Sequence, residues 1–192
     1  HNERLEFLGD AVLELIVTHA LYNKFKEAAE GELTAYRAGL VNMNTLSKVA
    51  IELGFNDRMM LSKGEQKDTN SKARQSILAD AYEAFLGALY LDQGYDASRQ
   101  FVENTLMPEL TDIIKYRLYK DPKSNLQERS QEDLSITPSY KVLSESGPDH
   151  NKVFVSGVYF DNVLIAEGKG QSKHESETAA AREALKAKGW GK

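Results

Sequence analysis

The spacing of apolar residues changes once along the chain, near residue 120, and this change limits the possible folds more than any other feature. Before it, apolar residues recur every three or four positions, which is typical of helices that bury one face. Three such runs cover residues 5–16, 33–53 and 77–89. We therefore expect residues 1–118 to form an all-helical domain, with helix ends or turns at three of its glycines. These are Gly31, Gly54 and Gly94.

Beyond a linker that we place at residues 119–122, the pattern predicts a second and smaller domain over residues 123–192. Apolar and polar residues alternate there in three short stretches, as they do in strands with one buried face. Glycine, proline, aspartate and asparagine mark turns between these stretches. The order α-β-β-β-α indicates an α+β domain. The expected elements are a helix over 123–132, strands over 139–144, 153–160 and 163–168, and a helix over 174–188.

The amino-acid composition excludes several kinds of site and limits the possible cellular location. The chain of 192 residues contains no cysteine, so disulfides and thiolate metal sites are excluded and a reducing, cytoplasmic location is expected. It has no apolar run long enough for a membrane span and no secretory leader. Its net charge of −5 means that any nucleic-acid contact must depend on local basic patches.

Five acidic residues fall at spacings that place them together on helix faces. Glu3, Glu6 and Asp10 are spaced i, i+3 and i+7, and Asp80 and Glu83 are spaced i, i+3, both among apolar neighbours. Burying unpaired carboxylates is costly, so two such helices side by side would favour a bound Mg²⁺, with Mn²⁺ able to substitute. The same spacing is common on solvated helix faces, where acids form only surface decoration or salt bridges.

The residues around these acids resemble a known family. Residues 3–13, with the sequence Glu-Arg-Leu-Glu-Phe-Leu-Gly-Asp-Ala-Val-Leu, resemble the signature of the ribonuclease III family, and residues 77–92 resemble its second acidic helix. The resemblance implies a Mg²⁺-dependent endoribonuclease that cuts both strands of double-stranded RNA. It further implies 5′-phosphate ends with short 3′ overhangs, and a role in ribosomal or messenger RNA processing. It also implies that the helices which precede the signature in this family are missing here.

The resemblance assigns roles to individual residues. It places Glu3 and Glu30 near the RNA backbone and cleavage site, and it implies a homodimer in which Phe7 inserts into the partner subunit. The alternatives are a core position for Phe7 and a solvated loop position for Glu30. The implied catalytic and metal-binding residues are Glu6, Asp10, Asp80 and Glu83.

Residues 123–192 resemble a double-stranded RNA-binding domain, which reads duplex shape through 2′-hydroxyls and phosphates. The family usually has two or three consecutive basic residues from Lys173 onward, whereas this chain continues with His174 and Glu175. We therefore expect a weaker and more salt-sensitive hold on RNA, and no DNA partner. The implied RNA-binding residues are Ser124, Gln127, Gln131, His150, Lys173 and His174.

One alternative belongs to a different functional class. Some relatives keep this fold as non-catalytic RNA-binding or ribosome-associated scaffolds. Such proteins are expected to lose one or more of the four carboxylates. All four are present in this chain, which favours the enzyme.

Overall fold

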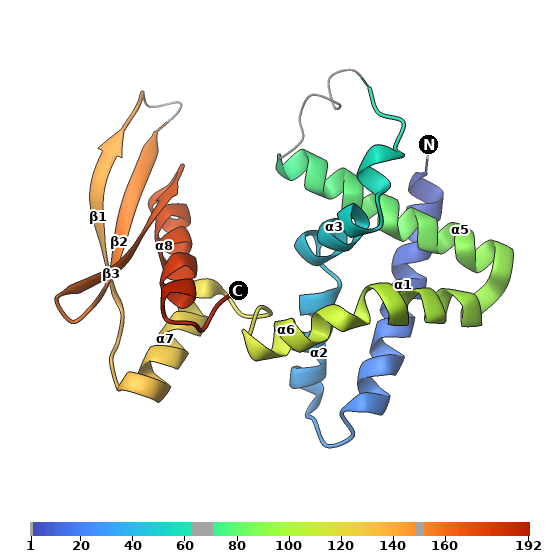
Figure 1. The fold of residues 1–192 in the computed structure, drawn as a ribbon, viewed down its shortest axis with the longest axis horizontal. Coiled ribbons are helices and arrows are strands. Elements are labelled where there is room, and N and C mark those ends of the chain that lie inside the picture. Colours follow the sequence, from blue (N-terminus) through green and yellow to red (C-terminus); the bar gives the residue numbers. More distant parts are fainter. Residues whose placement is uncertain (1, 63–70, 149–151) are drawn as a thin grey trace. The chain divides into compact units, whose positions relative to one another are not determined.

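The structure, a computed structural model, describes residues 2–62, 71–148 and 152–192. The chain divides into two compact units, His1–Ile113 and Ile114–Lys192. The first is helical and the second is built in the order α-β-β-β-α, as the sequence predicted (Figure 1). Within the described residues we find no helix with the length and apolarity that a membrane span requires.

The first unit is organised around two long helices, α1 (Glu3–Lys24) and α5 (Lys72–Thr105), which share its most extensive contact (Figure 1). Their apolar residues meet in a core that includes fully buried Leu13, Leu78 and Tyr82. Shorter helices complete the unit. They are α2 (Glu30–Leu40), α3 (Met43–Glu52), the 3-10 helices η1 (Phe55–Asp57) and η2 (Met107–Glu109), and α6 (Leu110–Lys115).

The apolar run over residues 33–53 is divided between α2 and α3, where the sequence had indicated one continuous stretch. The division falls at Asn42, whose side-chain oxygen accepts a hydrogen bond of 3.0 Å from the Thr45 amide. This is an N-cap, which satisfies a free amide at the start of α3. Apolar periodicity alone does not reveal the division, because the core-facing spacing continues across it.

The predicted glycine breaks had mixed outcomes. Gly54 and Gly94 adopt φ values of 75° and 80°, a region that favours glycine, and they mark the end of α3 and a kink inside α5. Gly31 was wrongly predicted as a break, since it lies in the first turn of α2, which begins at Glu30. A glycine is tolerated there because the first helical turn lacks most of its intrahelical hydrogen bonds.

The second unit is an antiparallel sheet in the order β1-β2-β3, with two helices packed on it. Leu126, Val158 and Ala180 are fully buried between the layers. At Gly168 the strand approaches the helix so closely that a Cβ would lie 2.0 Å from the Ala180 nitrogen. The elements are α7 (Pro122–Leu134), β1 (Ser139–Ser146), β2 (Val153–Phe160), β3 (Val163–Gly170) and α8 (Lys173–Ala187).

Candidate active site

Two glycines let α1 and α5 cross with their backbones in contact. A Cβ built on Gly9 would lie 1.8 Å from the Glu83 carbonyl oxygen, and one built on Gly87 would lie 2.1 Å from the Leu5 carbonyl oxygen. Both distances are far below van der Waals contact, so no other residue type fits without moving a helix. The crossing lies one turn or less from the acidic residues of both helices.

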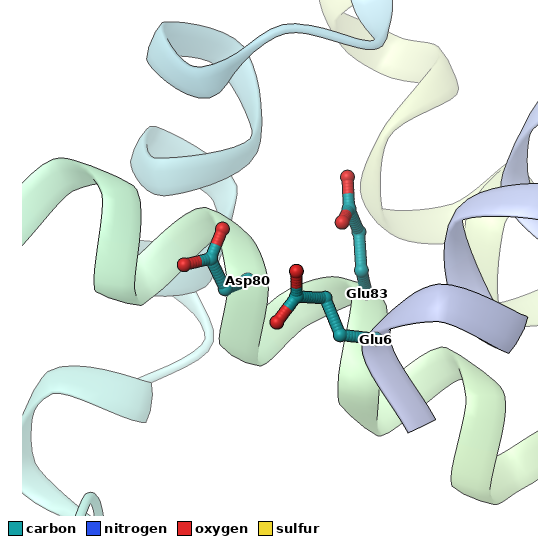
Figure 2. A group of neighbouring side chains, drawn as sticks. All are labelled: Glu6, Asp80 and Glu83. Carbon is teal, nitrogen blue, oxygen red and sulfur yellow. The ribbon is translucent and has the colours of Figure 1, made fainter. Parts of the chain in front are cut away.

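Three carboxylates converge beside this crossing. Glu6 extends from α1, and Asp80 and Glu83 extend from α5 (Figure 2). One oxygen from each lies within 4.8 Å of one from each of the others. All three side chains are partly buried, so they retain access to solvent. The spacing that placed acids on one face of each helix therefore produces a shared cluster.

Asp10 stands at the edge of this cluster. It is exposed and is not among the three carboxylates that lie within 4.8 Å of one another. It is close enough to act on them electrostatically, because its charge contributes to the raised pKa of both Glu83 and Glu6. The four predicted acids thus form one electrostatic group, with Asp10 at its periphery.

Protonation of the cluster reflects burial and mutual repulsion. Burial, together with the charges of Asp10, Asp80 and Glu6, raises the pKa of Glu83 to about 7. Burial is also the largest cause of the raised pKa of Glu6, followed by the charge of Asp80. The pKa of Asp80 is raised by burial, an effect opposed by a hydrogen bond from Ser76. Without a cation, full ionisation of this group is unfavourable.

The donor set suits a hard divalent cation. Three carboxylates that offer only oxygen ligands at this spacing fit Mg²⁺ or Mn²⁺, and water completes the coordination of such ions. In the part of the chain that the structure describes, no second group of three or more possible ligands is found. The cluster is therefore the candidate metal centre.

The other predicted residues of the first unit lie outside the cluster. Glu3 is in the first turn of α1 and is one of the charges that raise the pKa of Glu6. Glu30 begins α2, where its carboxylate accepts a hydrogen bond of 3.0 Å from Thr34. Phe7 is 82% exposed, so the alternative that it belongs to the core of its own chain is wrong.

Five of the six predicted RNA-binding residues lie on two helices of the second unit. Ser124, Gln127 and Gln131 are exposed on α7, and Lys173 and His174 are exposed in the first turn of α8. His150 and Asp149, in the expected β1–β2 turn, lie outside the described residues.

Glu175, which departs from the basic family pattern, has a structural role that sequence reasoning missed. Its amide donates to the Ser172 hydroxyl over 3.1 Å, and its carboxylate accepts from the Gln171 amide over 2.9 Å. These bonds cap the start of α8, in the manner of a serine and glutamate three residues apart. The Ser-x-x-Glu spacing was the signal that could have revealed it.

Comparisons with known proteins agree with this architecture. A family model described as Ribonuclease-III-like matches residues 1–110, and one described as Double-stranded RNA binding motif matches residues 122–188. The chain belongs to the ribonuclease III family. Among its relatives is Ribonuclease 3 of Desulforamulus reducens, 46% identical over 185 residues, which cover 96% of this chain and 75% of that protein. Ribonuclease 3 of Enterococcus faecalis is 45% identical over 96% of this chain and 80% of its own length.

Two solved structures are also similar to this chain. The nuclease domain of ribonuclease III from Campylobacter jejuni is 41% identical, with a TM-score of 0.53 over 56% of this chain and 75% of that one. Dicer from Pichia stipitis is 32% identical, with a TM-score of 0.51 over 97% of this chain and 87% of that one. Together with the two domain matches, these relatives identify an endoribonuclease that acts on double-stranded RNA. The scaffold alternative is not favoured.

Proposed function

We propose that this ribonuclease III family member cleaves double-stranded RNA with Mg²⁺ held by Glu6, Asp80 and Glu83, with Asp10 beside them. Mn²⁺ would substitute. The observation that carries the proposal is the convergence of three carboxylates from two helices to within 4.8 Å. Family membership alone does not require this geometry, because a member without catalytic activity would have no need to keep the acids together.

Each acidic side chain has a distinct part in the proposed chemistry. A Mg²⁺ ion held by these side chains would supply Lewis acidity, which makes an attacking water more acidic and offsets negative charge on the phosphate. Glu6 and Asp80 would supply ligand oxygens from the two crossing helices, α1 and α5. Glu83, whose pKa without metal is about 7, would give up its proton when the cation binds and supply a third ligand oxygen. Exposed Asp10 can orient water through hydrogen bonds at the edge of the cluster.

We further propose that the second unit holds the duplex and prefers it to single strands. Ser124, Gln127 and Gln131 are short polar side chains exposed on α7, suited to contacts with 2′-hydroxyls in a minor groove. Lys173 and His174 stand at the amino end of α8, where the helix dipole favours phosphate. His150 stays a proposed contact by resemblance only.

A dimer would explain cutting of both strands. The ring of Phe7 is 82% exposed and therefore accessible to a second copy, and we propose that it makes this contact, as the family resemblance implies. The structure from Campylobacter jejuni is described as showing flexibility in a region involved in dimer formation of that nuclease domain. Two copies would present two clusters, one for each strand. They would leave 5′-phosphates and short 3′ overhangs.

The biological setting is proposed from the relatives. From membership in the family of the proteins named Ribonuclease 3, we propose a role in processing ribosomal and messenger RNA in the cytoplasm. Glu3 and Glu30 are proposed to lie near the RNA backbone, with Glu3 beside Glu6 on α1.

The test is cleavage of a long, perfectly paired RNA with Mg²⁺, with end analysis of the products. Glu83→Gln and Asp80→Asn should abolish cleavage while duplex binding, measured with Ca²⁺, remains, because Ca²⁺ activates water poorly. Glu27→Gln, at an exposed glutamate outside the cluster, is the matched control and should cut normally. Full cleavage by either cluster variant would refute the site. Equal cutting of single-stranded RNA would refute the proposed selectivity.

A further inference from the structure

Residues 115–120, here called the clasp, are held against α7 by hydrogen bonds to their backbone. Asn125 donates from its side-chain nitrogen to the Tyr116 carbonyl over 2.9 Å. One turn later, Arg129 donates to the Lys115 carbonyl over 2.8 Å. Asn125 is only 2% exposed, so the first of these bonds is shielded from water. The clasp therefore has a fixed place on one face of α7.

Two cationic side chains of the clasp form ion pairs with two acidic side chains of α7. The Arg117 guanidinium donates to both oxygens of Glu132, at 3.1 and 2.9 Å, and lies 3.6 Å from Glu128. Lys120 forms an ion pair with Glu128 as well. The hydrogen bond from Arg117 is the main cause of the lowered pKa of Glu132. A planar guanidinium gripping both oxygens of a carboxylate is the strongest form of such a pair.

The backbone of the clasp supports this arrangement. Arg117 adopts a φ of 51°, a conformation that a residue with a side chain rarely takes. Backbone hydrogen bonds on either side, from Arg117 to Ile114 and from Lys120 to Arg117, close the turn around it. The turn directs both cations toward the same helix.

The two acids flank the side chains that we propose read the duplex. Glu128 and Glu132 each come one residue after Gln127 and Gln131 on α7, so they project roughly 100° further round the same helix turns. A phosphate approaching this face would come within the Debye length of roughly 10 Å, where unpaired carboxylates repel it. The chain as a whole carries a net charge of −5, so it has no overall basic excess to overcome that repulsion.

We propose that the clasp prepares α7 for RNA, with Arg117 and Lys120 neutralising Glu128 and Glu132 so that duplex phosphates can approach the neighbouring glutamines. Arg117 and Lys120 are positioning residues, since they act through the two acids. Ion pairs between partly exposed side chains add little to stability, so the effect falls on RNA affinity and not on folding. The inference rests on the proposed role of α7 in RNA binding.

The experiment measures binding of the full chain to a fluorescent RNA duplex by anisotropy, without divalent metal so that no cleavage occurs. The double variant Arg117→Gln with Lys120→Gln should bind the duplex about tenfold more weakly. This is expected because the carboxylates of Glu128 and Glu132 would then face the phosphates without their cation partners. Adding Glu128→Gln and Glu132→Gln to it should restore wild-type affinity. The matched control is Arg99→Gln, since Arg99 forms similar pairs with Glu103 and Asp96 in the first unit and should leave affinity unchanged.

The outcomes separate the possible explanations. Unchanged affinity in the double variant would overturn the proposal. Weaker binding that the two glutamate replacements do not rescue would also overturn it, because the cations would then contact phosphate directly. All variants should melt within about 3 °C of wild type. If the double variant Gln127→Ala with Gln131→Ala binds the duplex as tightly as the wild type does, α7 does not contact RNA as proposed. The proposed role of the clasp would then be wrong as well, whereas the proposed nuclease site would be unaffected.

Discussion

Replacing Gly87 with alanine tests whether the helix crossing builds the carboxylate cluster. The added methyl would lie 2.1 Å from the Leu5 carbonyl oxygen and 3.0 Å from the Gly9 nitrogen. Ordinary contact begins at 3.4 Å, so the first distance falls short by 1.3 Å. The obstacle is backbone within a helix and not the end of a flexible side chain, so α1 and α5 must separate by roughly 1 Å.

The size of the effect follows from that separation. Overpacking of this kind costs about 1–3 kcal/mol, equivalent to a fall in Tm of up to roughly 10 °C for a domain of this size. The separation moves Glu6 away from Asp80 and Glu83. A displacement of about 1 Å in a catalytic group can reduce the rate by about 100-fold. We therefore expect cleavage to fall far more than the fraction of folded protein.

The assay compares Tm with the cleavage rate for duplex RNA at a temperature well below both melting transitions. Gly31→Ala is the matched control, because a methyl at Gly31 meets nothing within 4 Å and alanine favours helix. That control should keep its activity and melt at or slightly above the wild-type temperature. Near-wild-type cleavage and Tm in Gly87→Ala would refute the idea that this close crossing positions the acids.

Three further predictions address protonation, ligand orientation and phosphate attraction. Because the folded pKa of Glu83 is about 7, well above its ordinary value, metal-free stability should fall as pH rises from about 4.5 to 7. Glu83→Gln should remove that loss and stabilise the metal-free chain at pH 8 by about 1–2 kcal/mol after allowance for solvent screening, with no difference at pH 4.5. Thermal melts of both proteins at the two pH values check this prediction. Equal Tm values for the variant and the wild type at pH 8 would contradict it. Ser76→Ala removes the hydrogen bond to Asp80 and should weaken Mn²⁺ binding by about tenfold in calorimetry. Ser98→Ala, on the same helix but bonded to the Gly94 carbonyl, should not do so, and equal losses in the two variants would indicate a general effect on folding. Lys173→Gln should weaken duplex binding and make its logarithmic salt dependence less steep by about one unit, whereas an unchanged slope would mean that Lys173 contacts no phosphate.

Much of the fold followed from the sequence because its signals are local. Alternation over residues 153–160 predicted a strand that the structure reproduces as Val153–Phe160. The acid spacing on each helix was equally readable, since 3.6 residues per turn decides which side chains share a face. The division at Asn42 was missed because a single cap interrupts a continuous apolar pattern.

The remaining features of the structure could not be predicted from the sequence, because they depend on contacts between distant parts of the chain. Nothing near Gly9 in the sequence indicates that its partner is the backbone at Glu83, more than 70 residues away. The hold of Asn125 and Arg129 on the backbone of the clasp was likewise invisible, because carbonyl groups carry no sequence signal. Periodicity predicts which acids share a helix face, whereas helix packing decides whether two faces meet.

The most direct measurement is anomalous diffraction from crystals of the full chain grown with Mn²⁺. The account predicts a Mn²⁺ peak bonded to carboxylate oxygens of Glu6, Asp80 and Glu83, and no such peak in crystals of Asp80→Asn. Mn²⁺ bound elsewhere while these three side chains remain without an ion, or an unchanged peak in the variant, would contradict it.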